Sequence, residues 1–93
     1  MSLDNTQKRS LKSKAHHLDP VVMIGSKGLT DAIFAETEAA LLHHELIKIK
    51  IKADREERQH MAAQLCTRLG AELIQVLGQT CVIYRKNRQA KKS

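Results

Sequence analysis

The chain has 93 residues, with 16 Lys and Arg against 10 Asp and Glu, so its formal net charge is +6 and its pI is near 9.6. This length suits one domain with a single modest core. The charge favours a polyanionic partner, with nucleic acid ahead of an anionic membrane surface. No apolar run approaches the ~18 residues of a membrane span, and the basic, polar residues 1–15 lack a hydrophobic signal region. We therefore expect a cytoplasmic protein with no membrane partner.

The sequence shows no arrangement of cysteine, histidine or nucleophilic residues that is typical of a catalytic or metal site. Cys66 and Cys81 form no Cys-x-x-Cys pair and are typical of small buried residues in a reducing compartment. The histidines show no metal-ligand spacing, and no evident nucleophile has a paired base. We therefore expect no catalytic residue, no metal, no cofactor and no small-molecule substrate, which means that the protein is not an enzyme.

Hydrophobic spacing predicts seven elements in chain order. Apolar residues recur at helical intervals in three segments, the stretch 46–52 alternates strictly as a strand does, and Gly70 stands where a helix should end. The predicted elements are a helix over 6–17, a strand over 21–24, a helix over 31–44, a strand over 46–52, a helix from a cap at Asp54 to Leu69, and strands over 73–77 and 80–85 joined as a hairpin around Gly78. The order α-β-α-β-α-β-β predicts one domain of the α/β (α+β) class, in which helices cover a mixed four-stranded sheet.

The segment that joins the first strand to the second helix is the strongest candidate for a binding site. A buried apolar run ends at Gly25, Ser26 and Lys27 follow, and Gly28 precedes a helix for which Thr30 is the expected cap. Two glycines let another backbone approach closely, and the positive end of the helix dipole lies behind them. The pattern predicts a phosphate cradle.

The spacing of the glycines and of Lys27 distinguishes between the kinds of molecule that could supply this phosphate. A Walker A loop places its Lys and hydroxyl after the last glycine, but here Lys27 precedes Gly28. A dinucleotide fingerprint needs three glycines, and this loop has two. The KH module also clamps a nucleic-acid backbone with Gly-x-x-Gly, but between two helices, whereas a strand precedes the loop here. Nucleotide cofactors are therefore disfavoured.

Charge is unevenly distributed along the chain. Residues 29–47 contain acids and no Lys or Arg, whereas the first helix, the glycine loop, the strand 46–52 and the C-terminal segment are basic. Basic residues share one flank of the first helix and one face of the strand. The candidate binding residues are Gly25, Ser26, Lys27, Gly28, Thr30, Lys8, Arg9, Lys12, His16, Lys48, Lys50, Lys52 and Arg85.

Three stretches resemble the CRM domain, the chloroplast RNA splicing and ribosome maturation module. Residues 15–30 (AHHLDPVVMIGSKGLT) resemble its signature, residues 42–50 (LHHELIKIK) its second motif, and residues 82–85 (VIYR) its closing strand. A single copy in a short basic chain is similar to the bacterial YhbY-like proteins, which are associated with precursors of the large ribosomal subunit. The resemblance implies a domain over 1–86 with a basic flexible tail over 87–93.

The same resemblance implies a fold related to the C-terminal domain of bacterial initiation factor three and an RNA-binding loop at residues 25–28. It also implies structured RNA, in particular precursor 50S ribosomal RNA, as the partner of a monomer. Because the chain has one Tyr, one Phe and no Trp, we expect phosphate and shape recognition rather than base stacking. A DNA-binding or nucleoid role, a protein interaction through the acidic segment and, least favoured, RNA processing remain as alternatives.

Overall fold

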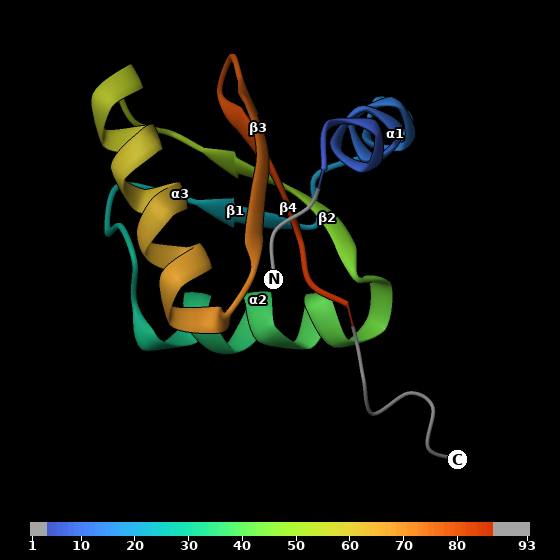
Figure 1. Ribbon diagram of the computed structural model, residues 1–93. Coiled ribbons are helices and arrows are strands. Elements are labelled where there is room, and N and C mark those ends of the chain that lie inside the picture. Colours follow the sequence, from blue (N-terminus) through green and yellow to red (C-terminus); the bar gives the residue numbers. More distant parts are fainter. Residues whose placement is uncertain (1–3, 87–93) are drawn as a thin grey trace.

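The structure is a computed structural model that describes residues 4–86 (Figure 1), so the predicted tail over 87–93 lies outside the described residues. The seven predicted elements are present in the predicted order, and their ends differ from the prediction by one or two residues, where hydrogen bonding fades. They are α1 (Asn5–Ala15), β1 (Val22–Ile24), α2 (Asp31–His44), β2 (Leu46–Ile51), α3 (Arg55–Leu69), β3 (Glu72–Leu77) and β4 (Thr80–Tyr84).

The strands form one mixed sheet in the order β1-β2-β4-β3. β1 pairs with β2 in parallel, and β4 runs antiparallel to both of its neighbours, β2 and β3. The chain passes through α3 from β2 to the far edge, and β4 then returns between them as the second half of a hairpin. The predicted mixed four-stranded sheet is confirmed.

The main core lies between the sheet and the two helices α2 and α3. The alternation in β2 turns Ile47, Ile49 and Ile51 to this side, and all three are at most 1% exposed. Val22 and Ile24 of β1 lie beside them, and residues of α2, α3 and β4 complete the cluster: Leu41, Ala62, Leu65, Cys66, Cys81 and Ile83. Full burial of one such aliphatic side chain contributes ~1.5–3 kcal/mol, so this cluster is the main source of stability.

α1 covers the opposite face of the sheet and lies apart from α2 and α3 (Figure 1). Ala15 is buried there against Ile74 and Val82. A register shift between Leu73 and Gln75 makes Ile74 an extra residue in β3. Because of this bulge, Leu73 and Val76, three residues apart, both pack on the main core, while Ile74 packs on the α1 side. The second, smaller core holds α1 on the sheet.

The helix boundaries follow from local hydrogen bonds. The expected caps at Thr30 and Asp54 accept bonds from the backbone N–H of Ile33 and Glu57, and Gly70 ends α3 with a left-handed φ of 66°. The reciprocal pair of bonds of a capping box forms at α1, between Asp4 and Gln7. Each cap contributes ~1 kcal/mol.

One arginine ties the end of β4 to both helices of the main core. The guanidinium of Arg85 makes a bidentate pair with Glu38 of α2, at 2.8 and 3.1 Å, and donates to the carbonyl oxygen of Leu69 at the end of α3, at 2.9 Å. The hydrogen bond from Arg85 holds the pKa of Glu38 below its usual value. The pair thus stabilises this end of the fold.

We predict that Arg85→Met lowers the free energy of unfolding by about 1–2 kcal/mol at pH 7, because it removes charge-assisted bonds around a partly exposed carboxylate. Because the pKa of Glu38 is lower in the folded than in the unfolded protein, its ion pair with Arg85 stabilises the fold at pH values above the ordinary pKa of the carboxyl group. This stabilisation is lost as the pH falls through the pKa of the folded state. Urea unfolding should therefore show a smaller difference in unfolding free energy between Arg85→Met and the native protein at pH 3 than at pH 7. Lys86→Met, at the exposed next residue, serves as the control. A loss as large at pH 3 as at pH 7 would contradict the role of Glu38.

Candidate nucleic-acid interface

The glycine loop forms a tight turn that exposes its two central residues. The N–H of Gly28 donates to the carbonyl oxygen of Gly25 at 3.0 Å, which closes the four-residue turn. Ser26 and Lys27 lie exposed at its tip. Gly28 has a φ of 71°, a left-handed value that other residues adopt only with strain. The backbone conformation therefore favours a glycine at 28.

Gly25 differs from Gly28 in this respect. Its φ is not in the left-handed region, and a Cβ built on it would have no heavy atom within 4 Å. Neither the backbone conformation nor the packing requires a glycine at this position. An exposed glycine without a structural reason leaves space for another molecule's backbone to approach.

The start of α2 contributes less positive potential than its dipole alone suggests. The Thr30 hydroxyl, a predicted binding group, accepts a bond from the N–H of Ile33 at 3.2 Å and so acts as the helix cap. Asp31 places an exposed carboxylate in the first turn, where it already complements the positive end of the helix. The cationic character of this corner must therefore come from side chains on the loop and on β2.

Lys48 and Lys50 of β2 and Lys52, which directly follows the strand, supply that charge. The N–H of Lys52 donates to the carbonyl oxygen of Ile24 at 2.9 Å, so Lys52 lies beside the residue that leads into the loop. Lys50 is paired in register with Met23 of β1, and Lys48 follows on the same face of the strand. Successive lysines are ~6.6 Å apart along the strand. We call Lys48, Lys50 and Lys52 the lysine row; it extends from the glycine loop across the sheet face that carries α1.

The C-terminal end of α1 meets this row. His16 and Lys48 line the same small hollow between α1 and the β3–β4 hairpin. Lys12 lies one turn before His16 on the same flank of the helix, and Lys8 one turn before Lys12. Lys12 and Arg9 are exposed, and Lys8 is half-buried. The structure thus brings His16 to the lysine row, and the other basic residues of α1 extend away from it.

Arg85 is set apart from the other predicted residues. It follows Tyr84, which pairs with Leu46 at the end of the sheet opposite the one where Lys50 pairs with Thr80. Its guanidinium is held by Glu38 and the end of α3 and is 19% exposed. We therefore leave Arg85 out of the interface and assign it a structural role, which a sequence motif alone does not distinguish from binding.

Two apolar residues of the predicted strands also belong to this surface, one of them, Met23, in the strand that was expected to be buried. Met23 and Leu77 are each 57% exposed. Strand register puts Met23, Lys50, Thr80 and Leu77 in one row across the sheet. The exposure of Met23 could have been predicted from strand alternation, since its neighbours Val22 and Ile24 both point into the core.

Among residues 4–86, no three His, Cys, Asp or Glu side chains gather where they could hold a metal ion, and no helix has the length and apolar character needed to cross a membrane. Cys66 and Cys81 are free and buried. Burial raises the pKa of the Cys66 thiol to about 11 and that of Cys81 to about 12. Both thiols therefore stay protonated near neutral pH and are poor nucleophiles.

The fold and this surface define a small basic α+β domain with an exposed Gly-Ser-Lys-Gly turn beside a lysine-bearing strand. Residues 3–85 match the family model of the CRS1 / YhbY (CRM) domain. The chain therefore belongs to the CRM domain family.

Relatives and a solved structure agree with this membership. The chain is 46% identical over 91 residues to a Haemophilus influenzae protein named "RNA-binding protein", an alignment that covers 97% of this chain and 92% of that one. It is 40% identical over 94 residues to a Pseudomonas aeruginosa protein named "Probable RNA-binding protein", with 100% and 90% covered. A Staphylococcus aureus protein solved in solution and described as a candidate RNA-binding protein superimposes with a TM-score of 0.84 at 33% identity, over 98% of this chain and 96% of that one. The predicted fold is thus confirmed.

We predict opposite effects of alanine on stability at the two loop glycines. Gly28→Ala should lower the free energy of unfolding by about 1 kcal/mol, because alanine is strained at a left-handed φ. Gly25→Ala should leave it unchanged or raise it by a few tenths of a kcal/mol, because alanine restricts the unfolded chain. Urea titrations of both variants measure these differences. A clear destabilisation by Gly25→Ala would show that the fold itself requires the glycine.

Proposed function

We propose that this protein binds structured RNA by contacting its phosphate backbone, with the glycine loop as the point of closest approach. The observation that carries this proposal is the position of an exposed glycine that the fold does not require, Gly25, beside Lys52 and Lys27. Backbone N–H groups and lysines are the usual partners of phosphate oxygens. The names of the relatives support RNA as the polyanion.

The lack of an available Phe or Tyr ring near this loop favours recognition of the RNA backbone and of the RNA shape over base stacking. Phe34 is half-buried against the main core, and the guanidinium of Arg68 lies 4.4 Å from its ring centroid, so its ring is not available to stack on a base. Tyr84 lies at the other end of the sheet. Without an aromatic platform, the loop and the lysine row suit the regularly spaced phosphates and 2′-hydroxyls of a folded RNA.

The acidic helix opposes the basic face and would orient the molecule on RNA. α2 carries Asp31 and Glu36, besides Glu38, whose charge Arg85 compensates, and packs on the side of the sheet opposite the lysine row. Like-charge repulsion keeps a polyanion away from this side, and the lysine row attracts it on the other. The asymmetry favours one docking orientation over a uniform electrostatic coating.

We further propose that the client is precursor 50S ribosomal RNA in the cytoplasm and that the protein acts as a monomer with no chemistry of its own. This finer statement is supported by the resemblance to single-domain YhbY-like proteins of ribosome assembly. Holding an RNA backbone without cutting it needs no acid, base or metal. The protein would thus shape or protect an assembly intermediate.

The salt dependence of binding tests the phosphate mechanism. If about five phosphates are contacted, log K should fall with log salt at a slope of roughly −3.5 to −4.5. Lys50→Gln should make the slope less negative by about 1, whereas Lys86→Gln, at the opposite end of the sheet, should leave it unchanged. Competition between a structured RNA and duplex DNA at fixed salt distinguishes the nucleoid role. An affinity that does not depend on salt would exclude the proposal.

The client is tested in cells by crosslinking followed by sequencing. The native protein should crosslink to precursors of the large-subunit RNA, and Gly25→Asp should lose these crosslinks, because it adds a carboxylate to the loop at a position where a Cβ fits. Gly25→Ala shows the effect of the Cβ without the charge. Crosslinks that Gly25→Asp leaves unchanged would rule out the loop as the anchor.

A further inference from the structure

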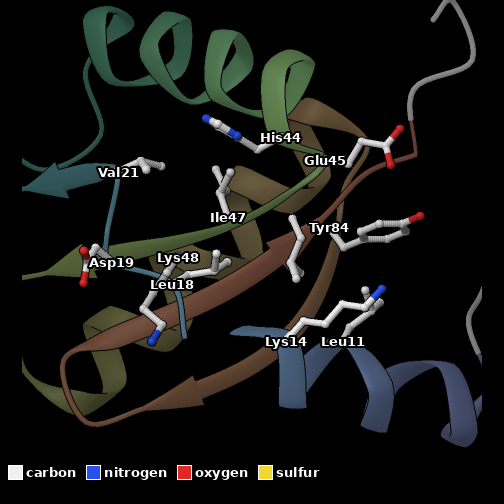
Figure 2. A pocket seen from close by; sticks show the side chains of 11 residues that line it. Leu11, Lys14, Leu18, Asp19, Val21, His44, Glu45, Ile47, Lys48 and Tyr84 are labelled. Atoms are coloured by element: carbon white, nitrogen blue, oxygen red, sulfur yellow. The ribbon is translucent and has the colours of Figure 1, made fainter. Parts of the chain in front are cut away.

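A second, larger hollow lies on the α1 side of the sheet, away from the glycine loop. It has a volume of about 490 Å³ and opens between α1, the connection into β1 and the end of α2. Figure 2 shows Tyr84, Lys14 and Leu11 along one side of the hollow and Val21 and Asp19 on the other. Its size falls within the range of about 300–1,000 Å³ typical of small-ligand pockets. The hollow can therefore accept a group as large as one nucleotide.

The lining combines three kinds of groups that a nucleotide needs. Tyr84 presents an aromatic side chain, and Leu11, Leu18 and Leu46 supply apolar surface around it. Lys14 is an exposed cation at the edge. Phe34 and Tyr84 are the one Phe and the one Tyr of the chain, and Phe34 is covered by Arg68. Tyr84 is therefore the larger ring on which a base can stack in this hollow, which the imidazole of His44 also lines.

The hollow is lined by two lysines, Lys14 and Lys48, and by two carboxylates, Asp19 and Glu45, so it offers hydrogen-bond donors and acceptors to a nucleotide without a net positive charge. Lys14 and Lys48 line the hollow and can neutralise a phosphate. The exposed carboxylate of Asp19 can accept a hydrogen bond from an exocyclic amino group of a base. Lysines, an aromatic ring and hydrogen-bond acceptors in one hollow favour a nucleotide over a purely apolar ligand.

Lys48 connects this hollow to the proposed interface. It lines both this hollow and the smaller one that contains His16, and it begins the lysine row that ends beside the glycine loop. Its carbonyl oxygen accepts the N–H of Val21 at 3.0 Å, at the wall of the larger hollow. From Lys48 to Lys52 the strand extends ~13 Å, a distance that a few nucleotides of one RNA strand can cover.

We propose that the hollow at Tyr84 accepts one unstacked nucleotide of the same RNA whose backbone contacts the glycine loop and the lysine row. The inference rests on the proposed function and adds a preference for RNA with an unpaired nucleotide next to a helix. It also revises the expectation that base stacking has no part in recognition, because a single ring can select a single base even where a multi-base platform is lacking.

Affinities for two RNA hairpins test the proposal. One hairpin is fully paired, and the other carries a single unpaired nucleotide at its junction. Tyr84→Leu removes the ring but keeps an apolar side chain on the second core. It should weaken binding of the hairpin with the unpaired nucleotide by roughly five- to hundredfold and leave the fully paired hairpin unaffected. Tyr84→Phe retains the ring and should bind both hairpins as the native protein does.

Photocrosslinking of the native protein makes the test independent of how well Tyr84→Leu folds. With 4-thiouridine as the unpaired nucleotide, mass spectrometry should find crosslinked peptides that contain Leu18 or Tyr84. If the native protein binds both hairpins equally and the crosslinks lie elsewhere, the pocket is excluded while the proposed function stands. If binding of both hairpins is weak and insensitive to salt, the proposed function itself fails and this inference fails with it.

Discussion

The parallel pairing of β1 with β2 is the contact on which the rest of the structure depends. Its register sets Val22 against Ile49 and Ile24 against Ile51, which places four fully buried aliphatic side chains in the centre of the main core. The same register sets Met23 beside Lys50 and brings the N–H of Lys52 to the carbonyl oxygen of Ile24. A slip of one residue would turn the lysines into the core. Core packing and the position of the charges beside the glycine loop therefore have one cause.

This arrangement gives the molecule two chemically different sides. α2 and α3 seal the aliphatic side of the sheet, and α2 adds acidic residues to its outer surface. The other side carries lysines and is covered by one helix, α1, whose own core is small. Because one helix cannot cover four strands, Met23, Leu77 and the lysine row stay accessible. The partly open sheet face is thus a result of the architecture, and the protein's proposed RNA contacts use it.

Strong local patterns made most of the fold predictable. The alternation over residues 46–52, the glycine at 70 and the caps at Thr30 and Asp54 act within a few residues of themselves, so their outcome depends little on the remainder of the chain. The β-bulge at Ile74 was not predictable in this way, because it appears only in the pairing of β3 with β4, where it turns Leu73 and Val76 to the same core. The glycine turn was recognisable from its spacing, but only the backbone φ values separate the structural Gly28 from the unconstrained Gly25.

By itself the sequence determined the elements, their order, the basic character of one strand face and the position of the glycine turn, because each of these is set by residues close together in the chain. The tertiary structure decided which of the basic residues meet. It joined the lysine row to the glycine loop through β1, assigned Arg85 to an ion pair with Glu38, and placed Tyr84 in a hollow with Lys14 and Lys48. These outcomes rest on contacts between residues far apart in the chain, which strand order and helix placement create and local patterns do not encode.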